Sequence, residues 1–513
     1  IKQLLALIVL PLGIIGTIYI FSNAGEPALI KQIVKKQKDT LVIEVDTSAL
    51  GKLNAYVDSV NNSPQLFSGN WSFYLIDVDS GNVIADVNID QNLVPASVMK
   101  IVSTGTALSI LGPYYRFSTR LQYDGTIDKA TRTLNGNIYI KGSGDPSLGA
   151  KSFGSSIEGV TKTWVNAIKY LDIDTIKGAI IADAESCDAN PIPNEWTWGD
   201  IQSDYGAGTC GLNIRENVYD LIFSGSKEAI YVRTSPEIPN LKLYNRAIYN
   251  SAVKPYAYVQ GAPFQFERVV FGEVQKDYVE RAVIPDPALL CAQHLKKRLS
   301  STGIYVEDSV ATSMRLLKLN HVKTNPKKDR RTIAKIFSPS LKALVHHTNH
   351  ASQNFYAESI LRAISLNDKG YGNSNSSINN IYGFWKKQNL DLRGLLMVDG
   401  CGLSRMNTIS THQLVDMLAF FAKDTIVFEP FYNSLPIAGE TGTLKNTAKN
   451  TSAHGNIHAK SGTMGRVKSY AGYVKTKSEK LLCFAVIGNN TLWSEKQLKG
   501  KFERLFALMA ELP

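Results

Sequence analysis

The sequence predicts an α+β protein whose main domain is split by a large β-rich insert, and three observations lead to that prediction. Strand-like runs at 467–474 and 481–487 suggest a β-meander near the C-terminus. Helical patterns occupy 97–111 and both sides of residue 352. Between them, from about 118 to 299, short β-branched and aromatic runs alternate with Gly, Asn, Asp and Pro clusters.

Length and composition describe an ordinary globular chain. With 513 residues, three domains is a fair expectation. The chain is 44% hydrophobic and 20% charged, which argues against disorder. The net charge of +11 comes from scattered basic residues, so we expect attraction to anionic envelope polymers and no binding of nucleic acid.

The first segment, residues 1–24, predicts export. An almost unbroken apolar run, Leu4–Phe21, precedes the small residues Ser22-Asn23-Ala24. This pattern fits a secretory signal peptide, and a single uncleaved membrane anchor is the alternative. Either way we expect the folded part in the periplasm or on the outer face of the cytoplasmic membrane.

The first motif with chemical meaning is Ser97-Val98-Met99-Lys100. On a helix, residues three apart share a face, so the lysine amine can approach the serine hydroxyl. A serine becomes a strong nucleophile only with a base beside it, and lysine is a base only when its pKa is lowered. We expect Lys460 to be the neighbouring cation that lowers it. Ser224-Gly225-Ser226-Lys227 has the same spacing, but its glycine suggests a turn.

Two further motifs follow in order. Ser352-Gln353-Asn354 lies between two helical patterns, where a short connection can present Ser352 and Asn354 to a cleft. Lys460-Ser461-Gly462-Thr463 is the only K-[ST]-G string in the chain and precedes the predicted meander. Gly462 would let substrate backbone lie against that strand, and the hydroxyls of Ser461 and Thr463 could hold a carboxylate.

Together the three motifs resemble the penicillin-interacting serine acyltransferases, and in particular the type-four D-alanyl-D-alanine carboxypeptidase/endopeptidases, a class of low-molecular-mass penicillin-binding proteins. The resemblance runs from about Trp71 to the C-terminus. It includes the segments Gly142–Leu148, Trp198–Asp200, Gly211–Asn213, Asp399–Arg405 and Leu435–Gly439. Two residues depart from the family pattern: Gln353 replaces a frequent aspartate, and Cys401 replaces a usual serine.

The resemblance implies a β-lactamase/transpeptidase-like domain, an antiparallel sheet with helices, formed by residues 40–117 and 300–513 around an insert at 118–299. It implies hydrolysis of peptidoglycan peptides ending in D-Ala-D-Ala, acylation by β-lactam antibiotics, and no cofactor. The roles it implies are Ser97 as nucleophile, Lys100 as base, Ser352 as proton relay, Lys460 as its polarising cation and Asn354 as substrate positioner. Ser461, Gly462 and Thr463 would bind substrate.

Within the insert, the strand-like runs are 122–124, 136–141, 176–182, 218–223 and 229–233. Helical periodicity at Asp286–Leu299 could mark re-entry into the main domain. Cys187 and Cys210 could form a disulfide, whereas Cys291, Cys401 and Cys483 are expected to pack as free thiols.

Four other functions fit part of the sequence pattern. His346 and His350 have the i,i+4 spacing of zinc hydrolases, with Glu358 beyond them, but no glutamate follows the first histidine directly, so we predict no metal site. A class A β-lactamase usually carries E-x-x-L-N, which is absent. An esterase or a non-catalytic peptidoglycan-binding protein on the same fold remains possible.

Overall fold

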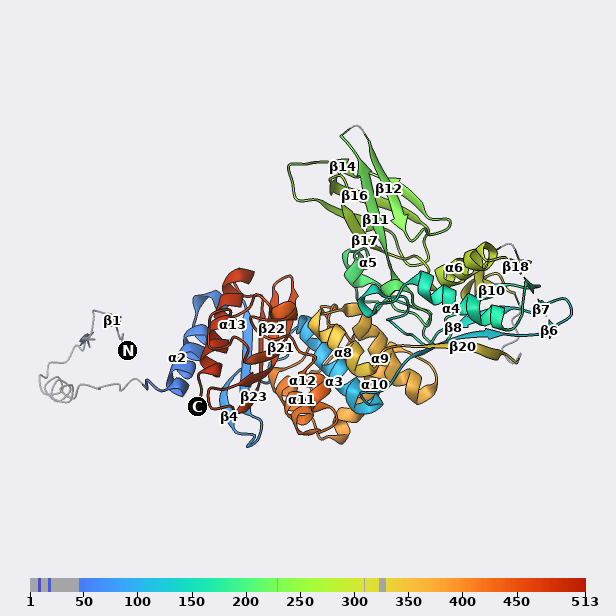
Figure 1. Cartoon of the computed structure of the whole chain (residues 1–513). Coiled ribbons are helices and arrows are strands. Elements are labelled where there is room, and N and C mark those ends of the chain that lie inside the picture. Colours follow the sequence, from blue (N-terminus) through green and yellow to red (C-terminus); the bar gives the residue numbers. More distant parts are fainter. Residues whose placement is uncertain (1–7, 11–16, 20–45, 228, 309, 323–328) are drawn as a thin grey trace, which may run out of the picture.

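The computed structural model describes residues 8–10, 17–19, 46–227, 229–308, 310–322 and 329–513. Figure 1 shows a main domain from which two smaller units project. The predicted export segment lies outside the described residues, except for the short paired strands β1 (Ile8–Leu10) and β2 (Thr17–Tyr19). Within the described part of the chain, no helix is both long and apolar enough to span a bilayer.

A five-stranded antiparallel sheet, in the order β21-β22-β23-β3-β4, forms the centre of the main domain. Its strands are β3 (Asn70–Asp77), β4 (Val83–Val87), β21 (Ile457–Met464), β22 (Val467–Lys475) and β23 (Leu481–Asn489). Because side chains alternate along a strand, β23 supplies two apolar clusters, one on each face of the sheet. Leu482, Phe484 and Val486 belong to one cluster, and Cys483, Ala485 and Ile487 belong to the other.

Helices cover both faces of this sheet. On one face α2 (Ala49–Asn61) and α13 (Glu495–Ala510) pack together, and α11 (Thr411–Lys423) packs on the other. Beyond α11 lie α3 (Met99–Leu111), α8 (Leu341–His350), α9 (Asn354–Lys369), α10 (Ser374–Lys387) and α12 (Phe428–Tyr432). The first ten residues of α3 are all buried, so this helix is the centre of the layer and holds its N-terminal end rigidly.

The first unit of the insert mixes helices and strands. One sheet, β19-β10-β8-β5-β20, contains β5 (Ser118–Tyr123), β8 (Ile138–Lys141), β10 (Ile180–Asp183), β19 (Thr312–Ser313) and β20 (Arg331–Phe337). A second, β18-β9-β7-β6, contains β6 (Thr126–Asp128), β7 (Thr133–Asn135), β9 (Thr175–Ile176) and β18 (Tyr305–Val306). The helices α4 (Ile157–Tyr170) and α6 (Pro287–Ser301) share one apolar cluster with these strands.

The second unit consists of strands. One sheet pairs β11 (Val218–Gly225) with β12 (Ile230–Ser235) and β17 (Val279–Val283). The other contains β13 (Lys242–Asn245), β14 (Ile248–Tyr249), β15 (Tyr256–Gln260) and β16 (Glu267–Val274). The prediction of a β-rich insert therefore fits this unit closely, whereas the first unit also contains two long helices.

The insert extends past its predicted end at residue 299. Helix α6 packs inside the insert and does not mark re-entry, because its apolar residues Leu295 and Leu299 join the insert cluster. The chain crosses back only after β20, which pairs antiparallel with β5. At the crossing, the Ser338 N–H donates to the Phe117 carbonyl at 3.1 Å, so the outgoing and returning segments lie side by side.

All five cysteines are free thiols, so the predicted Cys187–Cys210 disulfide was wrong, whereas the expectation for Cys291, Cys401 and Cys483 is confirmed. The Cys210 thiol instead donates to the Leu212 carbonyl at 3.1 Å.

Candidate active site

Ser97 lies at the N-terminal end of the central helix. It belongs to a 3₁₀ turn, Ala96–Val98, that runs directly into α3. Ala96 adopts a positive φ of 48°, a conformation that costs energy for a residue with a side chain and is often found at functional sites. Gly402 also packs closely on the Ala96 carbonyl. A Cβ added at Gly402 would come within 1.9 Å of that carbonyl oxygen. This packing fixes the direction of the turn that carries Ser97.

Lys100 lies one helical turn further on and is fully buried. Its Nζ is 3.0 Å from Ser97 Oγ, which confirms that the two residues share a face. Nζ also donates to Asn354 Oδ1 and to the Cys401 carbonyl, each at 2.7 Å. A carbonyl oxygen can only accept, so a neutral amine uses both of its protons on these partners. Its lone pair must then face the Ser97 hydroxyl, which is the arrangement a general base requires.

The second motif brings its residues from the junction of α8 and α9. Ser352 has a positive φ of 56°, and its Oγ accepts from Lys460 Nζ at 2.9 Å. Asn354 is the first residue of α9, and its Nδ2 donates to the Tyr205 carbonyl of the insert at 3.0 Å. Because that carbonyl can only accept, the Asn354 amide is fixed with its oxygen toward Lys100.

The third motif lies along β21. Lys460 is fully buried and also donates to the Ser461 carbonyl at 2.7 Å. Ser461 Oγ is 2.8 Å from Thr443 Oγ1. An added Cβ at Gly462 would come within 2.6 Å of the Pro95 carbonyl and 2.2 Å of Ser469 Oγ. Glycine is thus required because the segment leading to Ser97 presses against this strand, a reason that the motif alone did not reveal.

Burial lowers the pKa of both lysines. For Lys460, the charge of Lys100 lowers the pKa further, and no carboxylate pairs with it among the described residues. For Lys100, burial is the main cause, and the neighbouring side chains of Cys401, Asp399 and Glu358 oppose it electrostatically. The expectation that Lys460 lowers the Lys100 pKa is therefore replaced by desolvation as the main cause.

The reactive side chains open onto one cleft of about 410 Å³. Its walls include Ser97, Ser352, Ser461 and Thr463, together with residues outside the three motifs. These are Thr443, Asn446, Thr447, Lys468, Tyr470, Glu495 and Lys499. The two buried lysines lie under this cleft, so all eight predicted site residues are brought together.

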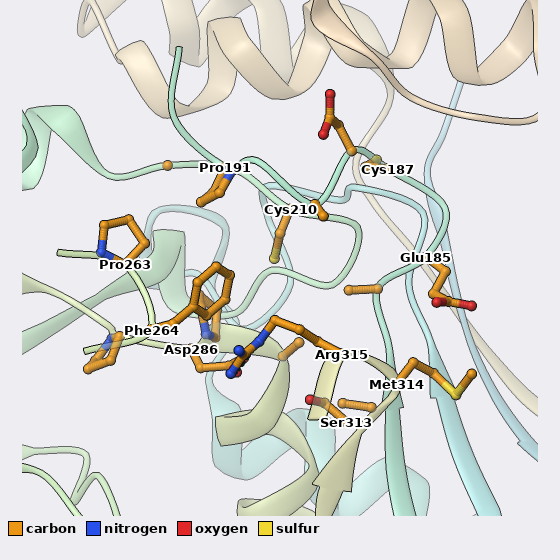
Figure 2. A pocket seen from close by; sticks show the side chains of 18 of the residues that line it. Glu185, Cys187, Pro191, Cys210, Pro263, Phe264, Asp286, Ser313, Met314 and Arg315 are labelled. Atoms are coloured by element: carbon orange, nitrogen blue, oxygen red, sulfur yellow. Dashed lines mark hydrogen bonds and ion pairs between the residues drawn. The ribbon is translucent and has the colours of Figure 1, made fainter. Parts of the chain in front are cut away.

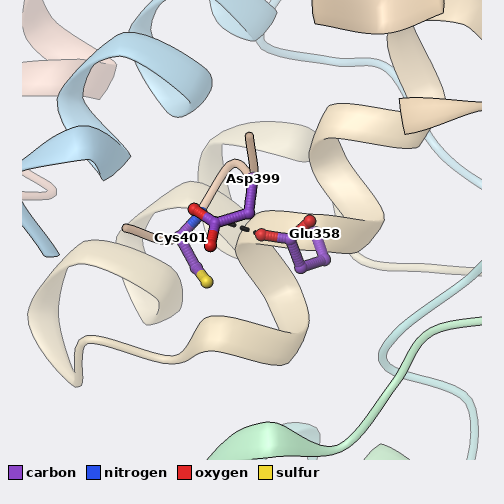
Figure 3. A group of neighbouring side chains, drawn as sticks. All are labelled: Glu358, Asp399 and Cys401. Atoms are coloured by element: carbon purple, nitrogen blue, oxygen red, sulfur yellow. Dashed lines mark hydrogen bonds between the residues drawn. The ribbon is translucent and has the colours of Figure 1, made fainter. Parts of the chain in front are cut away.

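A buried acidic layer supports Lys100. Figure 3 shows Glu358, Asp399 and Cys401 grouped beside α9. Glu358 accepts from the N–H groups of Gly400 and Cys401, both at 2.8 Å, and burial raises its pKa to about 7. The Asp399 carboxylate accepts from Asn407 Nδ2 at 2.8 Å and from Trp196 Nε1 of the insert at 2.9 Å. These bonds hold the loop whose Cys401 carbonyl receives Lys100.

Within the described residues, the two histidines considered as zinc ligands are not part of any group of potential metal ligands. The rings of His346 and His350 stack with their centroids 5.1 Å apart. Among the described residues, the one trio of potential metal ligands is Glu358, Asp399 and Cys401, which includes no histidine.

A larger cavity of about 660 Å³, here called the junction cavity, lies where the two insert units meet the main domain. Figure 2 shows Arg315 between Phe264 and Asp286 on its wall. Arg315 Nη2 is 2.8 Å from Asp286 Oδ2, and its guanidinium carbon lies 4.0 Å from the Phe264 ring centre. Lys318 pairs with Glu185. The junction cavity contains none of the three motifs, so its size does not make it the active site.

Comparison with known proteins identifies the family. The model of the D-Ala-D-Ala carboxypeptidase 3 (S13) family matches residues 53–512. The D-alanyl-D-alanine carboxypeptidase of Actinomadura sp. is 24% identical over 459 residues, 86% of this chain and 81% of its own length. The carboxypeptidase DacB of Haemophilus influenzae is 22% identical over 445 residues, 85% of this chain and 88% of its own.

The fold has a solved counterpart. The crystal structure of penicillin-binding protein 4 from Haemophilus influenzae superposes with a TM-score of 0.74 at 19% identity, covering 88% of this chain and 97% of that one. The family match, the curated relatives and this fold agree with the motif geometry. The chain belongs to the D-Ala-D-Ala carboxypeptidase 3 (S13) family and is a serine-type carboxypeptidase.

Proposed function

We propose that the protein cleaves peptidoglycan stem peptides ending in D-Ala-D-Ala, and the equivalent cross-links, through an acyl-enzyme on Ser97, and that β-lactams acylate the same serine. The observation that supports this most strongly is the 3.0 Å contact between Lys100 Nζ and Ser97 Oγ. The other two hydrogen bonds of Lys100 are directed to carbonyl oxygens. Relatives support it: one is named penicillin-sensitive carboxypeptidase A, from Dictyostelium discoideum, and is 24% identical over 80% of this chain.

Acylation begins with proton transfer from Ser97 Oγ to neutral Lys100. Ser97 Oγ then bonds to the carbonyl carbon of the penultimate D-alanine, and the carbonyl oxygen becomes an oxyanion. We assign its stabilisation to the backbone N–H groups of Ser97 and Thr463. The close approach of Gly462 to the Pro95–Ser97 segment supports this, because it brings together the two backbone segments that carry these N–H groups.

The leaving group departs with a proton from Ser352. As the C–N bond breaks, the amine of the last D-alanine takes the Ser352 hydrogen, and Ser352 regains one through Lys460, whose Nζ lies 2.9 Å away. Asn354 holds the amide on the acyl side, and Ser461 and Thr463 bind the terminal carboxylate. A water then attacks the ester carbon and gives one proton to Lys460 through Ser352, while Lys100 returns its proton to Ser97 Oγ as the acyl C–O bond breaks.

Substrate binding determines which of the two buried lysines, Lys100 or Lys460, carries the positive charge. Two buried ammonium groups repel each other, and the free cleft offers Lys460 no carboxylate among the described residues. A substrate carboxylate at Ser461 and Thr463 would favour the charged form of Lys460. Lys100 then remains neutral and able to accept the Ser97 proton.

We also propose that the enzyme acts outside the cytoplasmic membrane, where peptidoglycan lies. The apolar run Leu4–Phe21, as a cleaved signal or as an anchor, supports this. Fractionating cells that express the full chain would test it, and a cytoplasmic protein would contradict it.

Release of D-alanine from an N-acylated peptide ending in D-Ala-D-Ala tests the reaction. Wild type should release D-alanine and Ser97→Ala should not. Ser224→Ala is the matched control, because Ser224 of β11 and Lys227, just after that strand, repeat the S-x-x-K spacing, and it should keep wild-type activity. Activity in Ser97→Ala would contradict the proposal. Digesting purified cross-linked muropeptides with the same three proteins measures the endopeptidase share.

A further inference from the structure

Lys468 is a buried cation beside the predicted carboxylate site that none of the three motifs includes. It lies on β22 directly opposite Thr463 of β21, across the two-residue loop at Gly465 and Arg466. Directly opposed residues of an antiparallel pair lie on the same face of the sheet. Both therefore line the same cleft as Ser97. Only 8% of Lys468 is exposed, an unusual degree of burial for a lysine.

Its hydrogen bond fixes the direction of the Thr463 hydroxyl. Lys468 Nζ lies 2.8 Å from Thr463 Oγ1. An ammonium group has three donors and no acceptor, so Thr463 Oγ1 must accept this bond. The Thr463 hydrogen is then free to point elsewhere, and it can be donated to an anion in the cleft.

The charge of Lys468 is only partly neutralised. Glu495 Oε1 lies 3.3 Å from Nζ, but 67% of the Glu495 side chain is exposed, so water weakens this pair. Burial lowers the Lys468 pKa and Glu495 raises it. The other lysine that lines the cleft, Lys499, pairs with Glu503 and donates to the Asn446 carbonyl at 2.8 Å. Lys468 is thus the cation whose hydrogen bond ends on a substrate-binding hydroxyl.

From this geometry we propose that Lys468 is a positioning residue for the free carboxylate of the substrate. Acting through Thr463, it makes the cleft select peptides and β-lactams that carry a carboxylate beside the scissile amide, and discriminate against the same molecules with that carboxylate blocked. The inference rests on the proposed function and adds a specificity determinant to it.

Two matched ligand pairs test the proposal. One is an N-acylated D-Ala-D-Ala peptide and its C-terminal carboxamide, and the other is benzylpenicillin and its methyl ester. The measured quantity is the ratio of kcat/KM, or of the second-order acylation rate constant, between free acid and blocked form. Because charge-assisted hydrogen bonds are about twice as strong as neutral ones, Lys468→Met should lower that ratio about tenfold. Lys468→Arg, which keeps the charge and the donors, should restore most of it.

Two further variants separate selectivity from folding. Lys475→Met removes a half-exposed cation from the far end of the same strand and should leave the ratio unchanged. In an enzyme that already carries Thr463→Val, adding Lys468→Met should lower the ratio much less than Lys468→Met lowers it in the wild type. The reason is that the hydroxyl through which Lys468 acts is absent from that background. The comparison uses ratios, so a variant that is partly unfolded still reports its selectivity.

Several outcomes would overturn the inference. Equal losses on acid and blocked forms in both Lys468→Met and Lys468→Arg would reduce Lys468 to a packing role. A wild-type enzyme that does not distinguish acid from blocked form would also overturn it. Failure of the proposed function would look different, because wild type would then turn over none of the four ligands, or Ser97→Ala would turn them over.

Discussion

The catalytic cleft and the junction cavity differ in how their charges are partnered. The junction cavity is larger, about 660 Å³ against 410 Å³, but its cations are matched by carboxylates: Arg315 by Asp286 and Lys318 by Glu185. Under the cleft, Lys460 and Lys100 are fully buried and make their hydrogen bonds to hydroxyl and carbonyl oxygens. The paired charges hold neighbouring segments of the first insert unit together, whereas the unpaired lysines are available for proton transfer.

Burying the two lysines under the cleft costs free energy. A buried ammonium without a counter-charge loses hydration that its hydrogen bonds only partly replace. The free energy that offsets this cost comes from the two apolar clusters of the main domain, one on each side of its central sheet. Reactive groups are therefore identified by their unmatched charge and perturbed pKa more reliably than by the volume of the hollow beside them.

The largest expected effect is on the cleft side. Lys460→Met keeps the length of the side chain but removes the cation and the Ser352 hydrogen bond. Because a positioned proton-transfer group contributes about 10²–10⁴-fold, the benzylpenicillin acylation rate constant should fall within that range. Lys475→Met is the control. A rate within twofold of wild type would remove Lys460 from the relay and weaken the contrast between the two regions.

On the cavity side, the expected effect is on stability alone. Arg315→Met leaves the Asp286 carboxylate, only 3% exposed, without its counter-charge. We expect a loss of about 2–4 kcal/mol in the free energy of unfolding in urea, with the acylation rate constant unchanged. Arg393→Met, which breaks an exposed pair with Asp391, should leave stability near wild type. Slower acylation by folded Arg315→Met would show that the junction cavity participates in catalysis.

A smaller effect concerns pH and the layer under Lys100. The pKa of Glu358 is about 7 in the folded protein against an ordinary value of 4.5, so between these values the folded form holds a proton that the unfolded form releases. This contribution to stability is full below about pH 4.5 and is lost as the pH rises through about 7. In Glu358→Gln, unfolding free energies measured from pH 4.5 to 7.5 should fall less steeply.

Glu158→Gln removes an exposed carboxylate of α4 and serves as the control, which should keep the wild-type slope. An identical slope in Glu358→Gln and wild type would place the ionisation of Glu358 outside this range.

The smallest expected effect concerns the two thiols that line the junction cavity, Cys187 and Cys210. Both are free, so a reducing agent should change the thermal midpoint by less than about 1 °C. A disulfide would close a loop in the unfolded chain, and its reduction would lower the midpoint by several degrees. Such a drop would show that the cavity wall is covalently braced.

Sequence reasoning was strongest where one motif met a regular element. The i,i+3 spacing placed Lys100 beside Ser97, and the two strand-like runs after Thr463 predicted β22 and β23. The motifs in their order indicated the family, and in the structure Ser97, Ser352, Ser461 and Thr463 line one cleft.

Features set by distant contacts were not predictable in this way. Helix α6 has the pattern of any amphipathic helix, and only its packing against the insert shows which unit it belongs to. The positive φ of Ala96 goes with the close packing of Gly402, which lies about 300 residues further along the chain. Lys468 could have been found from the register of the hairpin, had Gly465 and Arg466 been recognised as its two-residue loop.

The central claim is that Ser97 forms the acyl-enzyme, and intact mass spectrometry with peptide mapping after incubation with benzylpenicillin tests it most directly. Wild type and Ser224→Ala should each gain one penicilloyl group on the peptide that contains Ser97, and Ser97→Ala should gain none. An adduct mapped to another residue, or an adduct of equal yield in Ser97→Ala, would contradict the account.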